Sequence, residues 1–101
     1  MNPGMIKKLQ KMQKEMVAAQ KELEASVFYG SAGGKMVEVE FFGSKRMKSI
    51  TIKPEAIEDK EDIDILQDMI NAAVNDCMRK IDDETQAVMS QFTGGGMPGL
   101  F

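Results

Sequence analysis

Apolar residues recur at helical spacing along the first quarter of the chain. Between residues 4 and 25 they stand three or four positions apart in one narrow seam, formed by Met5, Leu9, Met12, Met16, Ala19 and Leu23. Such spacing puts them on one side of a helix, whereas a strand has a period of two. Asn2 and Pro3 precede the seam and are typical of a helix N-cap and first helical position. The pattern predicts a helix over 4–25 that packs by a narrow face.

The pattern then changes to alternation, which is typical of β-strands. The expected strands are separated by short Gly-containing and Ser-containing turns and cover residues 27–30, 36–42 and 47–53. Val37 and Val39 alternate with glutamates, so we expect one buried and one solvated face. In the third strand, Ile50 and Ile52 should point inward. Because the turns are short, neighbouring strands should pair antiparallel in a three-stranded sheet.

A second long helix is predicted from Asp62 to about Phe92, after an acidic connector over 55–61. Its apolar stripe comprises Leu66, Met69, Ile70, Ala73, Val74, Cys77, Ile81, Val88 and Phe92. The glycines at 94–96 stop the helix, so we expect one domain over 1–93 and a flexible Gly-rich tail over 94–101. The element order is α-β-β-β-α, an α+β fold with two long helices.

The residue inventory excludes several kinds of site. The chain has no histidine and a single cysteine, Cys77, which falls in the apolar stripe and is expected to be a buried packing thiol. Zinc sites need several Cys or His ligands, and general acid–base catalysis most often uses His. We therefore expect no catalytic site, no metal and no small-molecule substrate.

No feature of the sequence predicts a membrane partner. No apolar run approaches the roughly 20 residues that span a bilayer, and no continuous apolar stretch follows the N-terminal lysines of 1–14 as it would in a secretory signal. The expected location is cytoplasmic.

Charge is distributed unevenly along the chain. The net charge is −3, but residues 1–25 carry five lysines against three glutamates, and residues 26–54 carry five basic residues against two acidic ones. Residues 55–101 carry three basic against eleven acidic residues. The positive charge of the first half favours binding of a polyanionic partner. It also has a simpler explanation, because lysines opposite an apolar seam are commonly a solvated face that aids helix formation and solubility.

The joint order of several short motifs resembles the YbaB/EbfC family of bacterial nucleoid-associated proteins. The matching segments are 8–13 (KLQKMQ), 30–34 (GSAGG), 37–39 (VEV), 52–55 (IKPE), 66–70 (LQDMI), 72–76 (AAVND) and the Gly-rich ending at 93–101. The resemblance implies a tweezer-like α/β homodimer without a cofactor. It also implies binding of double-stranded DNA with low or modest sequence preference, a nucleoid location, and a role in nucleoid organisation or gene expression.

The hypothesis for the interface combines this resemblance with the charge pattern. Phosphate contacts are assigned to Lys7, Lys8, Lys11, Lys14 and Lys21, with Arg79 and Lys80 as additions. Dimer or core packing is assigned to Leu9, Met12, Met16, Leu23, Val37 and Val39. The rival hypothesis is a dimeric protein-interaction scaffold, in which the Met-rich apolar surfaces and the tail dock a protein partner and the lysines only maintain solubility.

Overall fold

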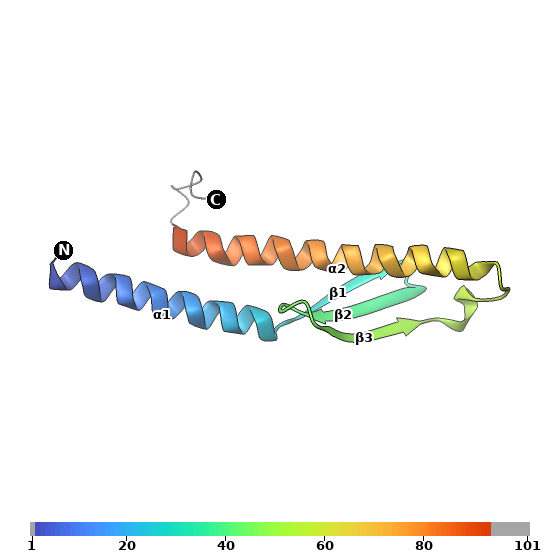
Figure 1. Ribbon diagram of the computed structural model, residues 1–101, viewed down its shortest axis with the longest axis horizontal. Helices are drawn as coiled ribbons and strands as arrows, with labels where there is room; N and C mark the ends of the chain where they lie inside the picture. The colour runs from blue at the N-terminus through green and yellow to red at the C-terminus, as the bar shows by residue number, and fades with distance from the viewer. Residues whose placement is uncertain (1, 94–101) are drawn as a thin grey trace.

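The structure, a computed structural model, describes residues 2–93. Its elements are α1 (Pro3–Ala25), β1 (Val27–Ala32), β2 (Val37–Phe42), β3 (Met47–Ile52), the short 3-10 helix η1 (Pro54–Ala56) and α2 (Asp62–Thr93) (Figure 1). This is the predicted α-β-β-β-α order, and the helix and strand bounds agree with the pattern to within a few residues. The predicted tail, 94–101, lies outside the described residues.

The start of α1 is fixed by its first residues, as predicted. Asn2 has an extended backbone, and its side-chain Oδ1 accepts a hydrogen bond from the N–H of Met5 at 2.7 Å. Pro3 occupies the first helical position, where its missing N–H costs nothing. At the other end, Ser26 returns to extended backbone and donates its N–H to the carbonyl of Leu23. α1 therefore leads straight into the sheet.

The sheet is an antiparallel meander in the order β1-β2-β3. Val39 of β2 lies opposite Gly30 of β1 and Ile50 of β3, so these three residues share one face. α2 lies across that face and covers β1 and β2 (Figure 1). The buried core is the alternating set of β2 packed on α2, namely Val37, Val39, Phe41, Ala73, Cys77 and Ile81.

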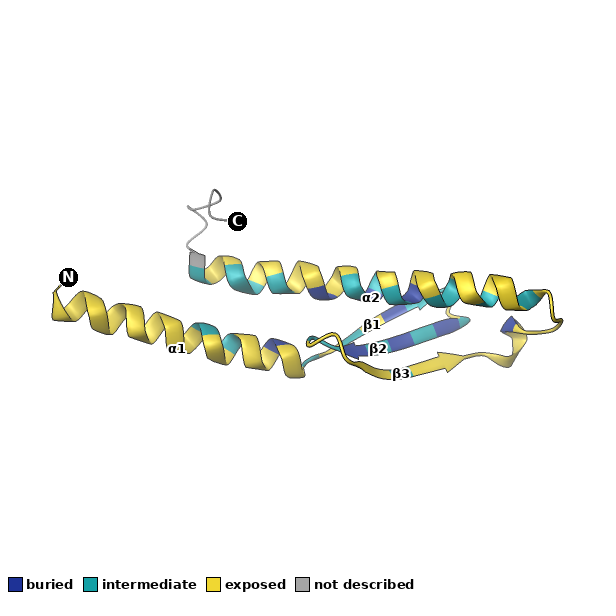
Figure 2. Cartoon of the chain, viewed as in Figure 1, coloured by how far each residue is buried: buried dark blue, intermediate teal, exposed yellow. Residues whose placement is uncertain are grey.

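The third strand differs from its prediction. Ile50 and Ile52 do lie on the same side of the sheet as the core valines, but they remain 41% and 37% exposed. The reason is that α2 covers β1 and β2 and leaves β3 open (Figure 2). Alternation correctly gave the side of the sheet on which these isoleucines lie. It could not give the burial, because burial depends on what covers that side.

The molecule is elongated and has a large surface for its size. Its extents are 70 × 25 × 15 Å and its radius of gyration is 19.4 Å, against about 13 Å for a compact domain of this length. The accessible surface is 7473 Å², whereas a compact monomer of this size exposes roughly 5,700 Å². The first turns of α1 extend past the end of α2 (Figure 1). The projecting helix and the open strand β3 both carry exposed large apolar side chains.

Candidate nucleic-acid interface

Four of the five lysines of α1 lie in its N-terminal half, whose first turns project past the end of α2 (Figure 1), whereas Lys21 lies near the sheet end of the helix. Residues 2–14 contain four lysines and no acidic residue, and all of them are exposed (Figure 2). Helix α1 is hereafter called the arm. Its five predicted lysines, hereafter the arm lysines, are Lys7, Lys8, Lys11, Lys14 and Lys21. The fold thus brings them together on one rigid element.

The arm lysines and the apolar seam occupy different sides of α1. Lys7, Lys11 and Lys14 each follow a seam residue by two positions, which is about 200° around a helix. Lys8 is different, since it follows Met5 by three positions and therefore lies on the flank of the seam. The seam can thus pack against another surface while most of the arm lysines stay free.

The arm lysines are hardly engaged in ion pairs with other described residues, so they are available to a ligand. Among the described residues the only ion pair that involves them joins Lys11 Nζ to Glu15 Oε1 at 4.0 Å, with both side chains more than half exposed. A pair of this kind contributes roughly 0 to 1 kcal/mol and exchanges readily with solvent. The five cations are therefore able to contact phosphates.

Arg79 and Lys80 lie elsewhere and are already engaged. They belong to the part of α2 that packs on the sheet. Arg79 Nη2 lies 2.6 Å from Asp76 Oδ1, and Lys80 Nζ lies 3.3 Å from Asp76 Oδ2. Lys80 also donates to the carbonyl of Tyr29 at 3.0 Å and lies 5.8 Å from the centre of its ring. These contacts join α2 to β1, a role that the sequence pattern did not indicate.

Asp76 is the centre of that contact. Its carboxylate accepts the backbone N–H of Ser31 at 3.2 Å, and this bond, followed by the nearby Lys80 and Arg79 cations, lowers the pKa of Asp76. Strand β1 is an edge of the sheet, and Asp76 and Lys80 form hydrogen bonds with backbone groups of β1 that point away from β2. Among residues 2–93, no side chain forms a hydrogen bond with the backbone groups of the other edge strand, β3, that point away from β2. The two edges of the sheet are therefore unequal.

Sequence reasoning left out a second basic group near the base of α1. The β2–β3 turn packs against the end of the helix, with Gly43 N–H donating to Ser26 at 2.8 Å. This turn carries Lys45, which pairs with Asp82 at 3.0 Å, and Arg46, which lies 4.9 Å from the ring centre of Phe42. Lys48 follows and is exposed. The positive net charge of residues 26–54 was the available signal, but only the fold shows that they adjoin the arm.

The residues assigned to packing divide into two groups. Leu23, Val37 and Val39 are buried within the chain, and Met16 is half-buried. Leu9 and Met12 remain 48% and 40% exposed. The first group belongs to the core and the α1–α2 junction, whereas the second has no covering element among residues 2–93.

The cysteine is a packing residue, as predicted. Cys77 is fully buried in the core, and burial raises the pKa of its thiol. A buried thiol of raised pKa is a poor nucleophile. Within the described part of the chain, no cluster of three or more His, Cys, Asp or Glu side chains is arranged to hold a metal ion. None of the helices described there is long and apolar enough to cross a membrane.

The chain is similar in sequence and in fold to known proteins. The chain is 48% identical over 100 residues to a nucleoid-associated protein of Acetivibrio thermocellus, covering 97% of this chain and 88% of the relative. It is 46% identical to one of Enterococcus faecalis, covering 96% and 91%. The crystal structure of an uncharacterized protein of Helicobacter pylori has the same fold, with a TM-score of 0.71 and 22% identity over 92% of this chain and 98% of the other.

These relatives are named for nucleoid association and not for an enzymatic activity, in line with the expectation of a non-enzymatic protein. The model of the YbaB/EbfC DNA-binding family matches residues 1–97, nearly the whole chain. The chain therefore belongs to the YbaB/EbfC DNA-binding family.

Proposed function

We propose that this protein is a nucleoid-associated protein that binds duplex DNA through the arm lysines. The observation that carries the proposal is the position of these five cations on one helix, where the only ion pair that they form within residues 2–93 joins Lys11 to Glu15 at 4.0 Å. A row of exposed lysines along a helix is suited to follow a phosphate backbone. Arg46 and Lys48 at the base of α1 would extend the row, while Arg79 and Lys80 contribute less because they already pair with Asp76.

Low sequence preference follows from the chemistry of the contacts. Phosphates position a protein on DNA but carry no direct sequence information. The acidic residues of the connector and the start of α2 repel DNA, which confines contact to the basic side of the molecule. The relatives are named nucleoid-associated proteins, and this name supports a nucleoid location for the chain. Bound to DNA there, in the cytoplasm, the protein would affect nucleoid organisation and gene expression.

We also propose that the functional unit is a homodimer formed across β3. Two observations support this interface. The apolar side of β3, with Met47, Ile50 and Ile52, extends the core face beyond α2 and is uncovered. Asp76 and Lys80 form hydrogen bonds with the free edge of β1, whereas within residues 2–93 no side chain does so for the free edge of β3. An exposed apolar edge strand tends to pair with a strand of another chain. A second copy would thus supply a second arm, as in a two-armed clamp.

Fluorescence anisotropy of a labelled random-sequence duplex tests DNA binding. We expect saturable binding whose affinity falls steeply between roughly 50 and 200 mM salt. Unlabelled duplexes of unrelated sequence should compete with similar strength. An absence of binding at low salt would contradict the proposal, and a strong preference among the competitors would contradict its low specificity.

One observation favours the rival scaffold function. Met5, Leu9 and Met12 form an exposed apolar row on α1. In the scaffold function this row would bind a protein partner, and the lysines on the other side of the helix would not bind DNA. In that case a Leu9→Lys variant would lose a captured protein partner, and the wild-type chain would retain no duplex at low salt. Retention of duplex by the wild type would favour the DNA-binding function.

A further inference from the structure

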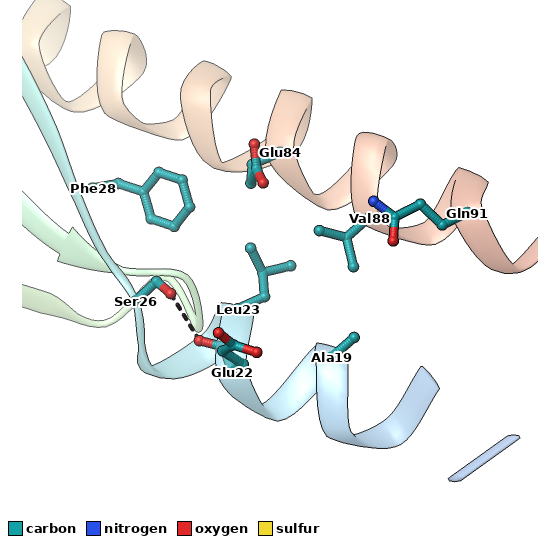
Figure 3. Close-up of a pocket in the computed structure, with 8 residues that line it drawn as sticks. All are labelled: Ala19, Glu22, Leu23, Ser26, Phe28, Glu84, Val88 and Gln91. Carbon is teal, nitrogen blue, oxygen red and sulfur yellow. Dashed lines mark hydrogen bonds between the residues drawn. The ribbon is translucent and has the colours of Figure 1, made fainter. Parts of the chain in front are cut away.

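A cleft lies between the C-terminal part of α1 and the second half of α2. It has a volume of about 440 Å³ and is lined by α1, β1 and α2 (Figure 3). Its floor is apolar and includes Leu23, Phe28 and Val88. Glu22 of α1 and Glu84 of α2 line it from opposite helices, and both are exposed. This arm cleft therefore presents an apolar floor between two carboxylates.

The tip of α1 has complementary chemistry. Met5 is 52% exposed, and Leu9 and Met12 follow it along the same side of the helix. Lys8 stands three positions after Met5 and four before Met12, so its ammonium group lies beside this apolar row. The tip carries no acidic residue before Glu15.

We propose that the tip of α1 from one dimer docks into the arm cleft of another dimer. In this arrangement Met5 and Leu9 pack on the apolar floor, and Lys8 lies between Glu22 and Glu84. The exposed apolar residues near Ile63 at the start of α2 are surrounded by acidic residues, so the two carboxylates would repel them. The exposed apolar side of β3 is covered by the second copy in the proposed dimer. Charge complementarity therefore selects the α1 tip as the occupant.

A chain cannot fill its own arm cleft in this way. Met5 and Leu23 lie on the same straight helix, 18 residues apart, which corresponds to about 27 Å at the helical rise. The contact must therefore join two molecules. Because tip and cleft are different surfaces, the contact is heterologous, and repeated contacts of this kind link dimers into arrays, either closed or open. Lys7 and Lys14 point away from the seam and stay free for DNA, so the array is compatible with the proposed function.

This inference rests on the proposed dimer for its repeating unit but not on DNA binding. Sedimentation velocity of the full chain without DNA, at about 50 mM salt and rising protein concentration, tests it. We expect species larger than a dimer that dissociate as salt screens the contact. Glu84→Lys should weaken this association about tenfold, since it replaces an attractive surface pair by a repulsive one. Asp83→Lys, which changes the same charge on the neighbouring exposed residue outside the cleft, should change it less than twofold.

A charge exchange identifies the occupant. Lys8→Glu should also weaken association, and the double variant Lys8→Glu/Glu84→Lys should recover most of it. Three results would overturn the inference: no species beyond the dimer in the wild type, equal effects of the two α2 substitutions, or no recovery in the double variant. Dissociation of the dimer itself by Glu84→Lys would overturn it too, because the cleft would then belong to the dimer interface. Failure of DNA binding in the anisotropy experiment is a separate result and would contradict the proposed function only.

Discussion

At the scale of single residues, the contact of α2 with the sheet depends on one carboxylate. Asp76 accepts the N–H of Ser31 and pairs with Arg79 and Lys80, and its side chain is 22% exposed. Hydrogen bonds to charged groups contribute about 1.5–3 kcal/mol when shielded from water. The partial exposure of Asp76 reduces this contribution.

We expect Asp76→Asn to destabilise the fold by about 1 kcal/mol at neutral pH. The pKa of Asp76 is lowered in the folded state, so its contribution is fully present above the ordinary value of 3.8 and is lost as the pH falls below it. In urea denaturation the wild type should therefore lose more stability than Asp76→Asn when the pH falls from 5 towards the acid limit of folding. Asp68→Asn, at an exposed position of the same helix, is the control. Equal acid sensitivity of Asp76→Asn and the wild type would contradict this role.

Gly30 allows α2 to approach the sheet closely. A Cβ at this position would lie 2.7 Å from Cys77 Cβ and 2.8 Å from Cys77 N. Side-chain atoms do not approach so closely, and the backbone on one side would have to move. The absence of a side chain at position 30 is therefore part of the core packing.

We expect Gly30→Ala to lower the free energy of unfolding by about 1–3 kcal/mol, the usual cost of overpacking a core. Urea denaturation measures this difference. Gly4→Ala is the control, because the new Cβ there would meet only Asn2 Oδ1 at 3.5 Å. If both substitutions had the same effect, the close approach of α2 would not depend on Gly30.

At the scale of elements, the sequence predicts what depends on neighbouring residues. The Asn2–Pro3 start of α1 and the alternation of Val37 and Val39 follow from local rules, and both are confirmed. The exposure of Ile50 and the pairing of Lys80 with Asp76 and Tyr29 were not predictable. These features depend on where α2 crosses the sheet, which a one-dimensional pattern does not contain. For the same reason, the arm lysines could be identified from the sequence, but the cleft and the basic turn at the base of α1 could not.

The N-cap should hold the first turn of the arm in place. We expect Asn2→Ala to destabilise that turn by about 1 kcal/mol, since it removes the bond from the Met5 N–H. Backbone hydrogen exchange of residues 5–8 should then become about fivefold faster. Asn71→Ala, in the interior of α2, should leave these rates unchanged. Unchanged rates in Asn2→Ala would show that the cap does not stabilise the arm.

At the scale of the whole molecule, the elongated shape and the uncovered strand have a common explanation in the proposed dimer. The accessible surface exceeds that of a compact monomer by roughly 1,800 Å². A standard interface removes about 800 Å² from each partner. A second copy that covers β3 would therefore remove part of this excess surface, and the arms would still project from the dimer.

Neighbouring residues of β3 give a matched test of this dimer. Ile50 lies on the α2 side of the sheet and Thr51 on the opposite side. We expect Ile50→Lys to raise the dimer dissociation constant at least about tenfold, because it places a charge in the apolar interface. Thr51→Lys should change it much less. Sedimentation equilibrium measures both, and a dimer that is equally stable in Ile50→Lys would place the interface elsewhere.

The central claim is that DNA is held by phosphate contacts of the arm lysines. The salt dependence of duplex affinity tests it most directly, by comparing Lys7→Gln/Lys11→Gln/Lys14→Gln with a matched triple variant off the arm, Lys35→Gln/Lys53→Gln/Lys60→Gln. Each lost phosphate contact should reduce the slope of log K against log salt by about 0.9, so the arm variant should lose about 2.7 for each bound arm. The off-arm variant should keep nearly the wild-type slope. An unchanged slope in the arm variant, or an equal loss in both variants, would contradict the claim.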